Sequence, residues 1–198
     1  MDAAEWDRRY AESGFLWSAG PNRFVEQELR ALPPGRGLDL ACGEGRNAVW
    51  LAESGWTMKG VDFSQVALDK AQKLAADRGV NVDWEEADVL QYTPESNAYD
   101  LVLVIYLHLQ WEQIAQVLRE AETALKSGGT FLLVGHDRTN LDSGYGGPPD
   151  PTVLYSEQDV AGALQHVTVE KAEKVTRAVA TDSGTKHAID CLVRGSKR

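Results

Sequence analysis

Two hydrophobic periodicities alternate along the middle of this chain. Short, nearly continuous apolar runs, such as Tyr99-Asp-Leu-Val-Leu-Val-Ile-Tyr106, are typical of strands buried on both faces of a sheet. Amphipathic segments of helical period lie between them and end at glycine or proline. The pattern predicts strands at 37–42, 57–61, 80–85, 99–106 and 130–135, and helices at 46–54, 64–77 and 111–125. Such an alternation indicates a parallel, doubly wound α/β sheet with helical crossovers.

The two ends of the chain depart from this alternation. Two helices are predicted ahead of the sheet, at 2–12 and from Pro21 to about residue 32. Near the C-terminus, strands at 167–175 and 186–194 are joined by a segment too short for a βα crossover. The predicted fold is therefore a Rossmann-like, doubly wound sheet of seven strands, mostly parallel, with an antiparallel C-terminal hairpin and N-terminal helices forming a lid.

Composition and charge narrow the classes of partner. The 198 residues predict one domain, with 1–34 as the helical lid and 35–198 as the core. A net charge of −10 without a basic run disfavours nucleic acid and anionic membranes as partners. Two cysteines, no metal-ligand cluster and no apolar leader lead us to expect a cytoplasmic protein without a metal, either a monomer or a homodimer.

The segment Leu38-Asp-Leu-Ala-Cys-Gly-Glu-Gly-Arg-Asn-Ala48 carries the candidate chemistry. Gly43 and Gly45 allow a tight turn and a close approach of the backbone to a ligand. Asp62, at the end of the second strand, can accept hydrogen bonds from both hydroxyls of a ribose. The bare pattern also satisfies the dinucleotide fingerprint, so a nicotinamide-dependent oxidoreductase is an alternative.

Three features disfavour that alternative. Asp39 places a carboxylate inside the first strand, where the dinucleotide pattern is apolar and where a carboxylate suits a ligand with a positive charge. The chain leaves no room for a second, substrate-binding domain, and the terminal hairpin is foreign to dinucleotide-binding folds.

These motifs resemble those of class I S-adenosylmethionine-dependent methyltransferases. The glycine loop resembles motif I, Asp62 matches the ribose-binding acid, and Glu86-Ala-Asp88 matches the acidic position that contacts adenine. Leu125-Lys-Ser-Gly-Gly-Thr130 resembles the turn before the fifth strand, so the resemblance covers about residues 36–136. Gly45-Arg-Asn47 and an N-terminal Trp-Asp-x-x-Tyr are similar to the tellurite-resistance and thiopurine methyltransferase branch, which methylates small, soft or anionic acceptors.

The resemblance implies S-adenosylmethionine as cofactor, S-adenosylhomocysteine as product, and a set of site residues. The implied cofactor-binding residues are Asp39, Ala41, Gly43, Gly45, Arg46, Asn47, Asp62, Phe63, Ser64, Asp88, Val89, Ile105, Trp17 and Arg23. Residues expected on the acceptor side are Trp6, Tyr10, His136 and Arg138, with His108 and Tyr106 as catalytic candidates. A general base is needed only for an acceptor that arrives protonated, and a lone histidine at a strand end is also a common structural residue.

The acceptor itself stays open at this point. A soft or anionic nucleophile, a thiol and a metabolite hydroxyl are all compatible with these residues, and the glycine-rich segment 140–150 is a candidate substrate lid. A non-catalytic protein that keeps the cofactor pocket is a further alternative.

Overall fold

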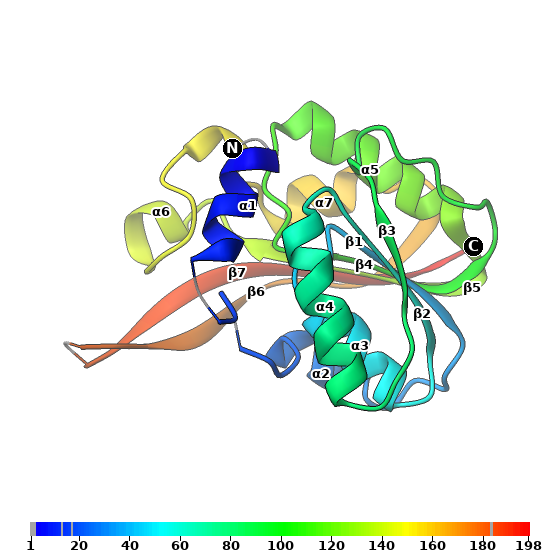
Figure 1. The fold of residues 1–198 in the computed structure, drawn as a ribbon. Coiled ribbons are helices and arrows are strands. Elements are labelled where there is room, and N and C mark those ends of the chain that lie inside the picture. The colour runs from blue at the N-terminus through cyan, green and yellow to red at the C-terminus, as the bar shows by residue number, and fades with distance from the viewer. Residues whose placement is uncertain (1–2, 13, 17, 183) are drawn as a thin grey trace.

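A seven-stranded sheet with the order β3-β2-β1-β4-β5-β7-β6 forms the centre of the molecule (Figure 1). The computed structural model describes residues 3–12, 14–16, 18–182 and 184–198. Strands β1 to β5 pair in parallel, and β7 runs antiparallel between β5 and β6. The strands are β1 (Arg36–Leu40), β2 (Thr57–Asp62), β3 (Asp83–Glu86), β4 (Tyr99–Ile105), β5 (Leu125–His136), β6 (Val167–Thr181) and β7 (Gly184–Lys197). This order confirms the predicted fold class.

Helices cover both faces of the sheet because its central strands are apolar on both faces. In β4, Val102 and Val104 pack in one hydrophobic cluster with α5, whereas Leu101 and Leu103 pack in another with α2 and α3. The helices are α1 (Ala3–Ala11), α2 (Arg23–Leu29), α3 (Arg46–Glu53), α4 (Gln65–Asp77), α5 (Trp111–Ala124), α6 (Asn140–Ser143) and α7 (Glu157–Ala163). Within the described part of the chain, no helix has both the length and the apolar character needed to cross a bilayer.

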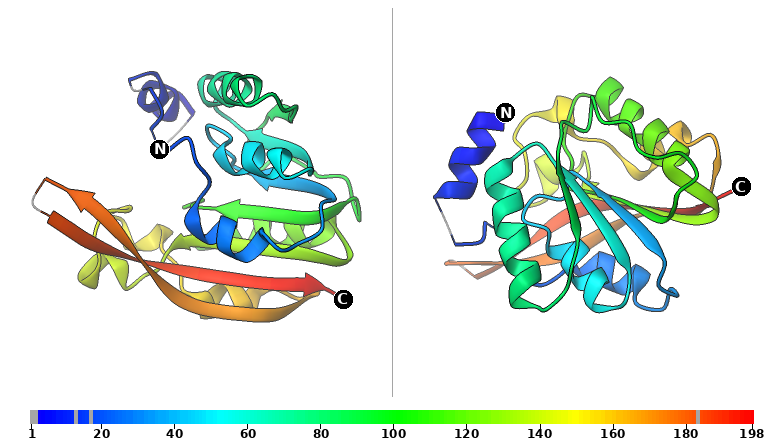
Figure 2. Two further views of the ribbon diagram at one scale, coloured as in Figure 1. Left: turned by 90° about the horizontal axis from the view of Figure 1, so that it is seen from below. Right: turned by 45° about the vertical axis from the view of Figure 1, so that its right-hand side comes forward.

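The two N-terminal helices occupy different places. Phe24, Val25 and Leu29 of α2 are buried in the core, so this helix belongs to the layer that covers the sheet. Helix α1 lies outside that layer beside α4, at the edge where the parallel strands end (Figures 1 and 2). Of these two helices, α1 is therefore the one placed to act as a lid.

The terminal hairpin is longer than the sequence pattern predicts. Its strands stay paired from Val167↔Lys197 to Thr181↔Gly184, and the distal part projects beyond the sheet (Figure 2). The side chains in this part are mostly exposed, so the hydrophobic pattern fades there although the backbone ladder continues. Segment 140–150, predicted as a flexible loop, contains α6.

Candidate functional site

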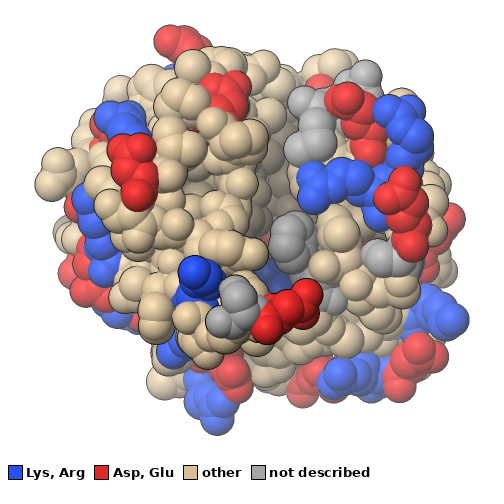
Figure 3. All heavy atoms as spheres, turned by 90° about the vertical axis from the view of Figure 1, so that its left-hand side faces the viewer, with Lys and Arg blue, Asp and Glu red and all other residues tan. Residues whose placement is uncertain are grey.

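The strand order reverses between β1 and β4, and the site is built at this point. In open α/β sheets, ligands bind at the carboxyl ends of the strands where the order reverses. Ala41 and Tyr106, the residues that follow β1 and β4, both adopt left-handed backbone angles, with φ of 58° and 56°. Such conformations in non-glycine residues gather at functional sites. Figure 3 looks onto this edge and shows a deep groove.

The turn after β1 requires glycine at two positions. Gly43 and Gly45 have φ of 54° and 74°, and α3 begins directly afterwards at Arg46. A Cβ on Gly45 would lie 2.5 Å from the Trp84 ring and 2.7 Å from the Cβ of Ala71. The loop is therefore held close against β3 and α4.

Asp39 is the most unusual polar group beside this loop. Its side chain is 1% exposed, and neither carboxylate oxygen has a hydrogen-bond partner among the described residues. Burial, and then the neighbouring charge of Asp62, raise the pKa of Asp39 to about 7, although Arg46 acts in the opposite direction. A buried carboxylate without partners is costly, so this position is suited to a ligand that brings a cationic donor.

Asp62 holds the loop in place from the end of β2. Its Oδ2 accepts a hydrogen bond from the backbone N–H of Gly43 at 2.8 Å, and Oδ1 accepts one from Ser64 at 3.0 Å. Burial raises the pKa of Asp62 in spite of these bonds. Each carboxylate oxygen has further acceptor capacity, so ribose hydroxyls can bind there without displacing the backbone donors.

The N-terminal segment closes over the same loop. The Tyr10 side chain is buried, and its hydroxyl lies 3.0 Å from the position that a Cβ of Gly43 would occupy. Trp6 stacks on Tyr10 with ring centroids 5.4 Å apart, and the Ser64 hydroxyl donates to Asp7. The structure thus places Trp6 and Tyr10, which were expected on the acceptor side, beside the glycine loop; Trp17 lies outside the described residues.

A second group of side chains lies at the ends of β4 and β5 and on the adjacent middle parts of β7 and β6. The Tyr106 hydroxyl donates to Asp190 Oδ2 at 2.7 Å, and Arg177 Nε donates to the same oxygen at 2.8 Å. His136 Nδ1 lies 3.1 Å from Asp190 Oδ1, although without the alignment of a linear hydrogen bond. The His136 ring also contacts Tyr106, with centroids 5.1 Å apart. These residues join the acceptor side of the site to the terminal hairpin.

His108 is placed in a structural role. Its Nδ1 lies 3.3 Å from the carbonyl oxygen of Val153, and its Nε2 accepts a hydrogen bond from the backbone N–H of His136 at 3.4 Å. Burial, and then His136, lower the pKa of His108 to about 4, so the ring is neutral. Both ring nitrogens are occupied by the fold, which argues against the predicted role of His108 as a general base.

Several other predicted site residues are engaged elsewhere. Arg138 is exposed and pairs with Asp159 at 2.9 Å, and Arg23 is an exposed residue of α2 beside Phe24. Asn47 accepts a hydrogen bond from the backbone of Asn22 and so ties α3 to α2.

The remaining predicted cofactor-binding residues are held in turns or in the core. The Asp88 side chain closes its own turn by accepting from the N–H of Leu90 at 2.9 Å. Val89 and Ile105 are buried in the core, and Phe63 is half-buried between Asp62 and Ser64.

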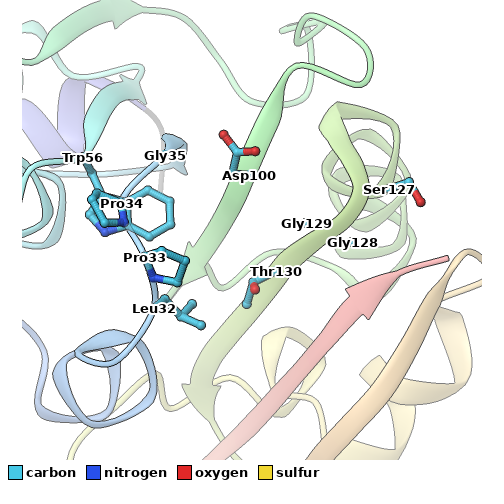
Figure 4. A pocket seen from close by; sticks show the side chains of 10 residues that line it. All are labelled: Leu32, Pro33, Pro34, Gly35, Trp56, Asp100, Ser127, Gly128, Gly129 and Thr130. Carbon is cyan, nitrogen blue, oxygen red and sulfur yellow. The ribbon is translucent and has the colours of Figure 1, made fainter.

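A cavity of about 380 Å³ lies at the opposite edge of the sheet (Figure 4). It is lined by Pro33, Pro34, Trp56 and the turn 127–130, near the amino ends of β4 and β5. Its one carboxylate, Asp100, already accepts hydrogen bonds from Lys126 and the N–H of Arg36. Because it is remote from the strand ends and its charge is neutralised, we do not assign the chemistry to this cavity.

Known proteins resemble this chain in sequence and in fold. Residues 38–129, just under half of the chain, match a family described as a methyltransferase domain. The findings support a class I S-adenosylmethionine-dependent methyltransferase domain. They also confirm the prediction of S-adenosylmethionine as the cofactor.

The individual relatives of this chain are distant. The methyltransferase GfsG of Streptomyces halstedii is 30% identical over 117 residues, which are 56% of this chain and 42% of GfsG. The N-methyltransferase NodS of Bradyrhizobium japonicum, solved with S-adenosylhomocysteine, superposes with a TM-score of 0.74 at 17% identity and covers 98% of this chain and 97% of its own. TehB of Haemophilus influenzae superposes with a TM-score of 0.77 at 15% identity, over 98% of this chain and 67% of its own. The chain spans half or less of the length of the curated relatives that it matches.

The residues of the site fit S-adenosylmethionine. Asp39 offers a buried, unsatisfied carboxylate to a ligand that carries an ammonium group and a sulfonium. Arg46, at the start of α3, is close enough to Asp39 and Tyr106 to interact electrostatically with both. When bound, the cofactor supplies an electrophilic methyl group.

Sequence reasoning missed four residues of the site. Asp190 and Arg177 lie on the terminal hairpin, and Glu44 and Asn140 hold the loops at either side of the groove. One signal was available, since Asp190 interrupts the apolar run 188–193 in the same way as Asp39 interrupts the first strand. The partners of Arg177 and Asn140 depend on contacts far apart in sequence, which no local pattern reveals.

Proposed function

We propose that this chain transfers the methyl group of S-adenosylmethionine to a small-molecule acceptor bound in the groove between α1 and segment 140–150. The observation that carries the proposal is the Asp39 carboxylate, which is buried without a partner directly beneath the glycine loop. The acceptor class that we propose is a soft or anionic nucleophile, a thiol or a metabolite hydroxyl.

The two halves of the site have separate roles. Asp39, Asp62 and the Gly43–Gly45 turn bind and orient the cofactor, and Tyr10 covers it from the N-terminal side. The side chains after β4 and β5 line the acceptor side. Methyl transfer is an in-line displacement, so holding the two reactants in line and excluding water supplies much of the acceleration. We place the enzyme in solution as a monomer or homodimer, acting in the cytoplasm.

The alternative of a nicotinamide-dependent oxidoreductase is disfavoured by the same carboxylate. A dinucleotide brings a pyrophosphate to the glycine loop, and Asp39 would lie beneath it as an unpaired negative charge. The alternative of a non-catalytic protein predicts tight cofactor binding without turnover.

Titration calorimetry with S-adenosylhomocysteine tests the cofactor site in wild type, Asp39→Asn and Asp83→Asn. Asp39 makes no hydrogen bond to the described residues, so the amide removes its charge without breaking the fold. We expect Asp39→Asn to weaken binding at least tenfold, about 1.4 kcal/mol. Asp83→Asn removes an equal charge at the exposed start of β3 and serves as the matched control.

Two results would count against the proposal. Wild-type protein that does not bind S-adenosylhomocysteine, or binds a reduced nicotinamide dinucleotide instead, would overturn the cofactor assignment. Binding without methylation of any acceptor in a broad panel of thiols, phenols and oxyanions would favour the non-catalytic alternative.

A further inference from the structure

One side chain on the acceptor side has an orienting partner and a ring nitrogen that the fold does not use. His136 ends β5, and its ring contacts Tyr106, which follows β4 at the point where the strand order reverses. The His136 side chain is 10% exposed. Its Nδ1 is buried and faces Asp190. Its Nε2 forms no hydrogen bond to a described residue and is not fully buried.

Asp190 is held as an anion at a fixed position. It is 0% exposed, and both Tyr106 and Arg177 donate to its Oδ2, which leaves Oδ1 to face the imidazole. Burial alone would raise the pKa of Asp190, but the close approach of His136 Nδ1, the hydrogen bond from Tyr106 and the charge of Arg177 outweigh burial and lower it. An ionised carboxylate next to Nδ1 favours the tautomer with the proton on Nδ1, so Nε2 is free to accept a proton.

Charged and titratable side chains from the neighbouring strands and loops surround this imidazole. Tyr106 from β4 stays protonated, because burial and then Asp190 raise the pKa of its hydroxyl. His108 is neutral and bonded at both nitrogens. Arg177 from β6 balances the charge of Asp190 on β7.

Asp137, next in the chain, accepts from the backbone N–H and the hydroxyl of Thr139 with its Oδ1, which also lies 3.5 Å from Lys174 Nζ. Its Oδ2 has no hydrogen-bond partner among the described residues but is fully buried. The backbone of Gly147 packs against the His136 ring, because a Cβ there would lie 2.9 Å from it. His136 is therefore the base that this half of the site offers to an acceptor, because its Nε2 is neither bonded nor fully buried.

We propose that His136 is the general base of the reaction, that Asp190 is its positioning residue, and that the acceptor is therefore an alcohol or phenol. This inference rests on the proposed function and narrows its acceptor class. The acceptor oxygen forms a bond to the methyl carbon while its proton passes to Nε2 of His136. The bond between that carbon and sulfur breaks, and its electron pair stays on sulfur, giving S-adenosylhomocysteine. The positive charge that leaves the sulfonium reappears on the imidazolium, where it faces Asp190.

A hydroxyl requires such a base more than the other candidate acceptors do. A phenol has a pKa near 10 and an aliphatic alcohol a higher one, so both are protonated at neutral pH. An oxyanion or a thiolate arrives with its lone pair already available, and an oriented dyad would serve no purpose for it.

Two kinds of methyl acceptor, one protonated and one ionised, distinguish the effect of the base from the effect of the rest of the site. Methylation of simple phenols and of the corresponding benzenethiols is measured in single turnovers at pH 8 with wild type, His136→Gln and His166→Gln. We expect His136→Gln to slow phenol methylation at least a hundredfold, which is the usual contribution of a general base, and to change benzenethiolate methylation less than threefold. His166→Gln alters an exposed histidine outside the site and should match wild type.

A second measurement does not depend on turnover. Long-range proton–nitrogen NMR of the S-adenosylhomocysteine complex should show that the His136 ring carries its proton on Nδ1. The His136 signals are assigned as those that disappear in His136→Gln. Asp190→Asn should abolish this preference while thermal melting shows that the variant is folded. A wild-type ring protonated on Nε2, or unchanged by Asp190→Asn, would overturn the inference.

The outcomes distinguish this inference from the proposed function. Benzenethiol methylation without phenol methylation, or equal losses on both probes in His136→Gln, would overturn the base and leave methyl transfer standing. Failure of the wild type to methylate phenols while it methylates other acceptors of the broad panel would overturn this inference alone, whereas failure on the whole panel while binding S-adenosylhomocysteine would overturn both.

Discussion

Both carboxylate oxygens of Glu44 accept a hydrogen bond from the backbone N–H of Leu16, at 3.0 and 2.9 Å. Glu44 lies between the two glycines of the turn after β1, and its side chain is buried. Lys70 of α4 lies 3.2 Å from the same carboxylate and also donates to the backbone carbonyl of Tyr10. The cofactor loop and the N-terminal lid are thus joined through one side chain.

We expect Glu44→Gln to loosen the lid. The amide keeps the size of the side chain but removes the charge that Leu16 and Lys70 face, so binding of S-adenosylhomocysteine should weaken three- to tenfold, roughly 0.6–1.4 kcal/mol. Trypsin cleavage after Arg8 and Arg9 should become faster, as followed by mass spectrometry. Glu12→Gln, an exposed change near the end of α1, is the control. Unchanged affinity and cleavage in Glu44→Gln would show that the lid closes without this contact.

The raised pKa of Asp39 gives stability a definite pH dependence. The folded-state pKa of about 7 lies above the value of an unfolded aspartate, so the folded protein holds the extra proton between about pH 4 and pH 7. The free energy of unfolding should therefore fall as the pH rises through this window, by up to roughly 4 kcal/mol at 1.36 kcal/mol per unit.

Asp39→Asn should remove this contribution. Urea unfolding of wild type and Asp39→Asn at pH 5 and pH 8 measures the difference, in the absence of cofactor. The raised pKa would be contradicted if the difference in free energy of unfolding between wild type and variant were the same at both pH values. Saturating S-adenosylhomocysteine at pH 8 should restore stability to wild type more than to the variant, because its ammonium group pairs with the carboxylate.

Gly45→Ala should destabilise the protein by roughly 2–5 kcal/mol. About 1–2 kcal/mol comes from the left-handed backbone angle and about 1–3 kcal/mol from the overlap with Trp84 and Ala71. Gly79→Ala is a matched control, since Gly79 has φ of 69° but nothing within 4 Å of its added Cβ. Urea unfolding should give a loss near 1–2 kcal/mol for this control. Equal losses in both variants would show that the loop can move away from β3 at little cost.

Asn140→Ala should weaken binding of the acceptor while leaving binding of the cofactor almost unchanged. The Asn140 amide accepts from the N–H of Ile189 and donates to the carbonyl of Gly146, both at 2.7 Å, so it ties segment 140–150 to β7. Its loss leaves these groups without partners at a cost of about 1–3 kcal/mol. The KM for a phenol acceptor should rise, whereas affinity for S-adenosylhomocysteine should stay within twofold of wild type. A parallel loss of both would indicate that the segment supports the whole site.

The sequence pattern predicted the parallel part of the fold because the signals for it are local. The glycine turn, Asp39 and Asp62 follow one another within one βαβ unit, and each has a recognisable residue type at a fixed place in it. The hydrophobic period predicted the alternation of strands and helices and hence a parallel sheet, whereas the order of the strands in that sheet comes from the structure.

The acceptor half was less accessible to sequence reasoning because its contacts are long-range. Tyr106 meets Asp190 across 84 positions of the chain, and His108 meets Val153 across 45. His108 looked like a candidate base from its place after β4, but its role depends on a carbonyl that only the fold brings near. The hairpin was predicted too short because its exposed distal strands lack an apolar pattern.

The position of the terminal hairpin has a consequence for how the protein is made. Arg177 and Asp190 lie on strands that are synthesised after those that carry Asp39 and Asp62. Because β7 can pair with β5 only after it has left the ribosome, the residues of the glycine loop precede those of the hairpin in the nascent chain. A nascent chain that has not reached β6 therefore lacks Arg177 and Asp190, and with them both hydrogen-bond partners of the Tyr106 hydroxyl.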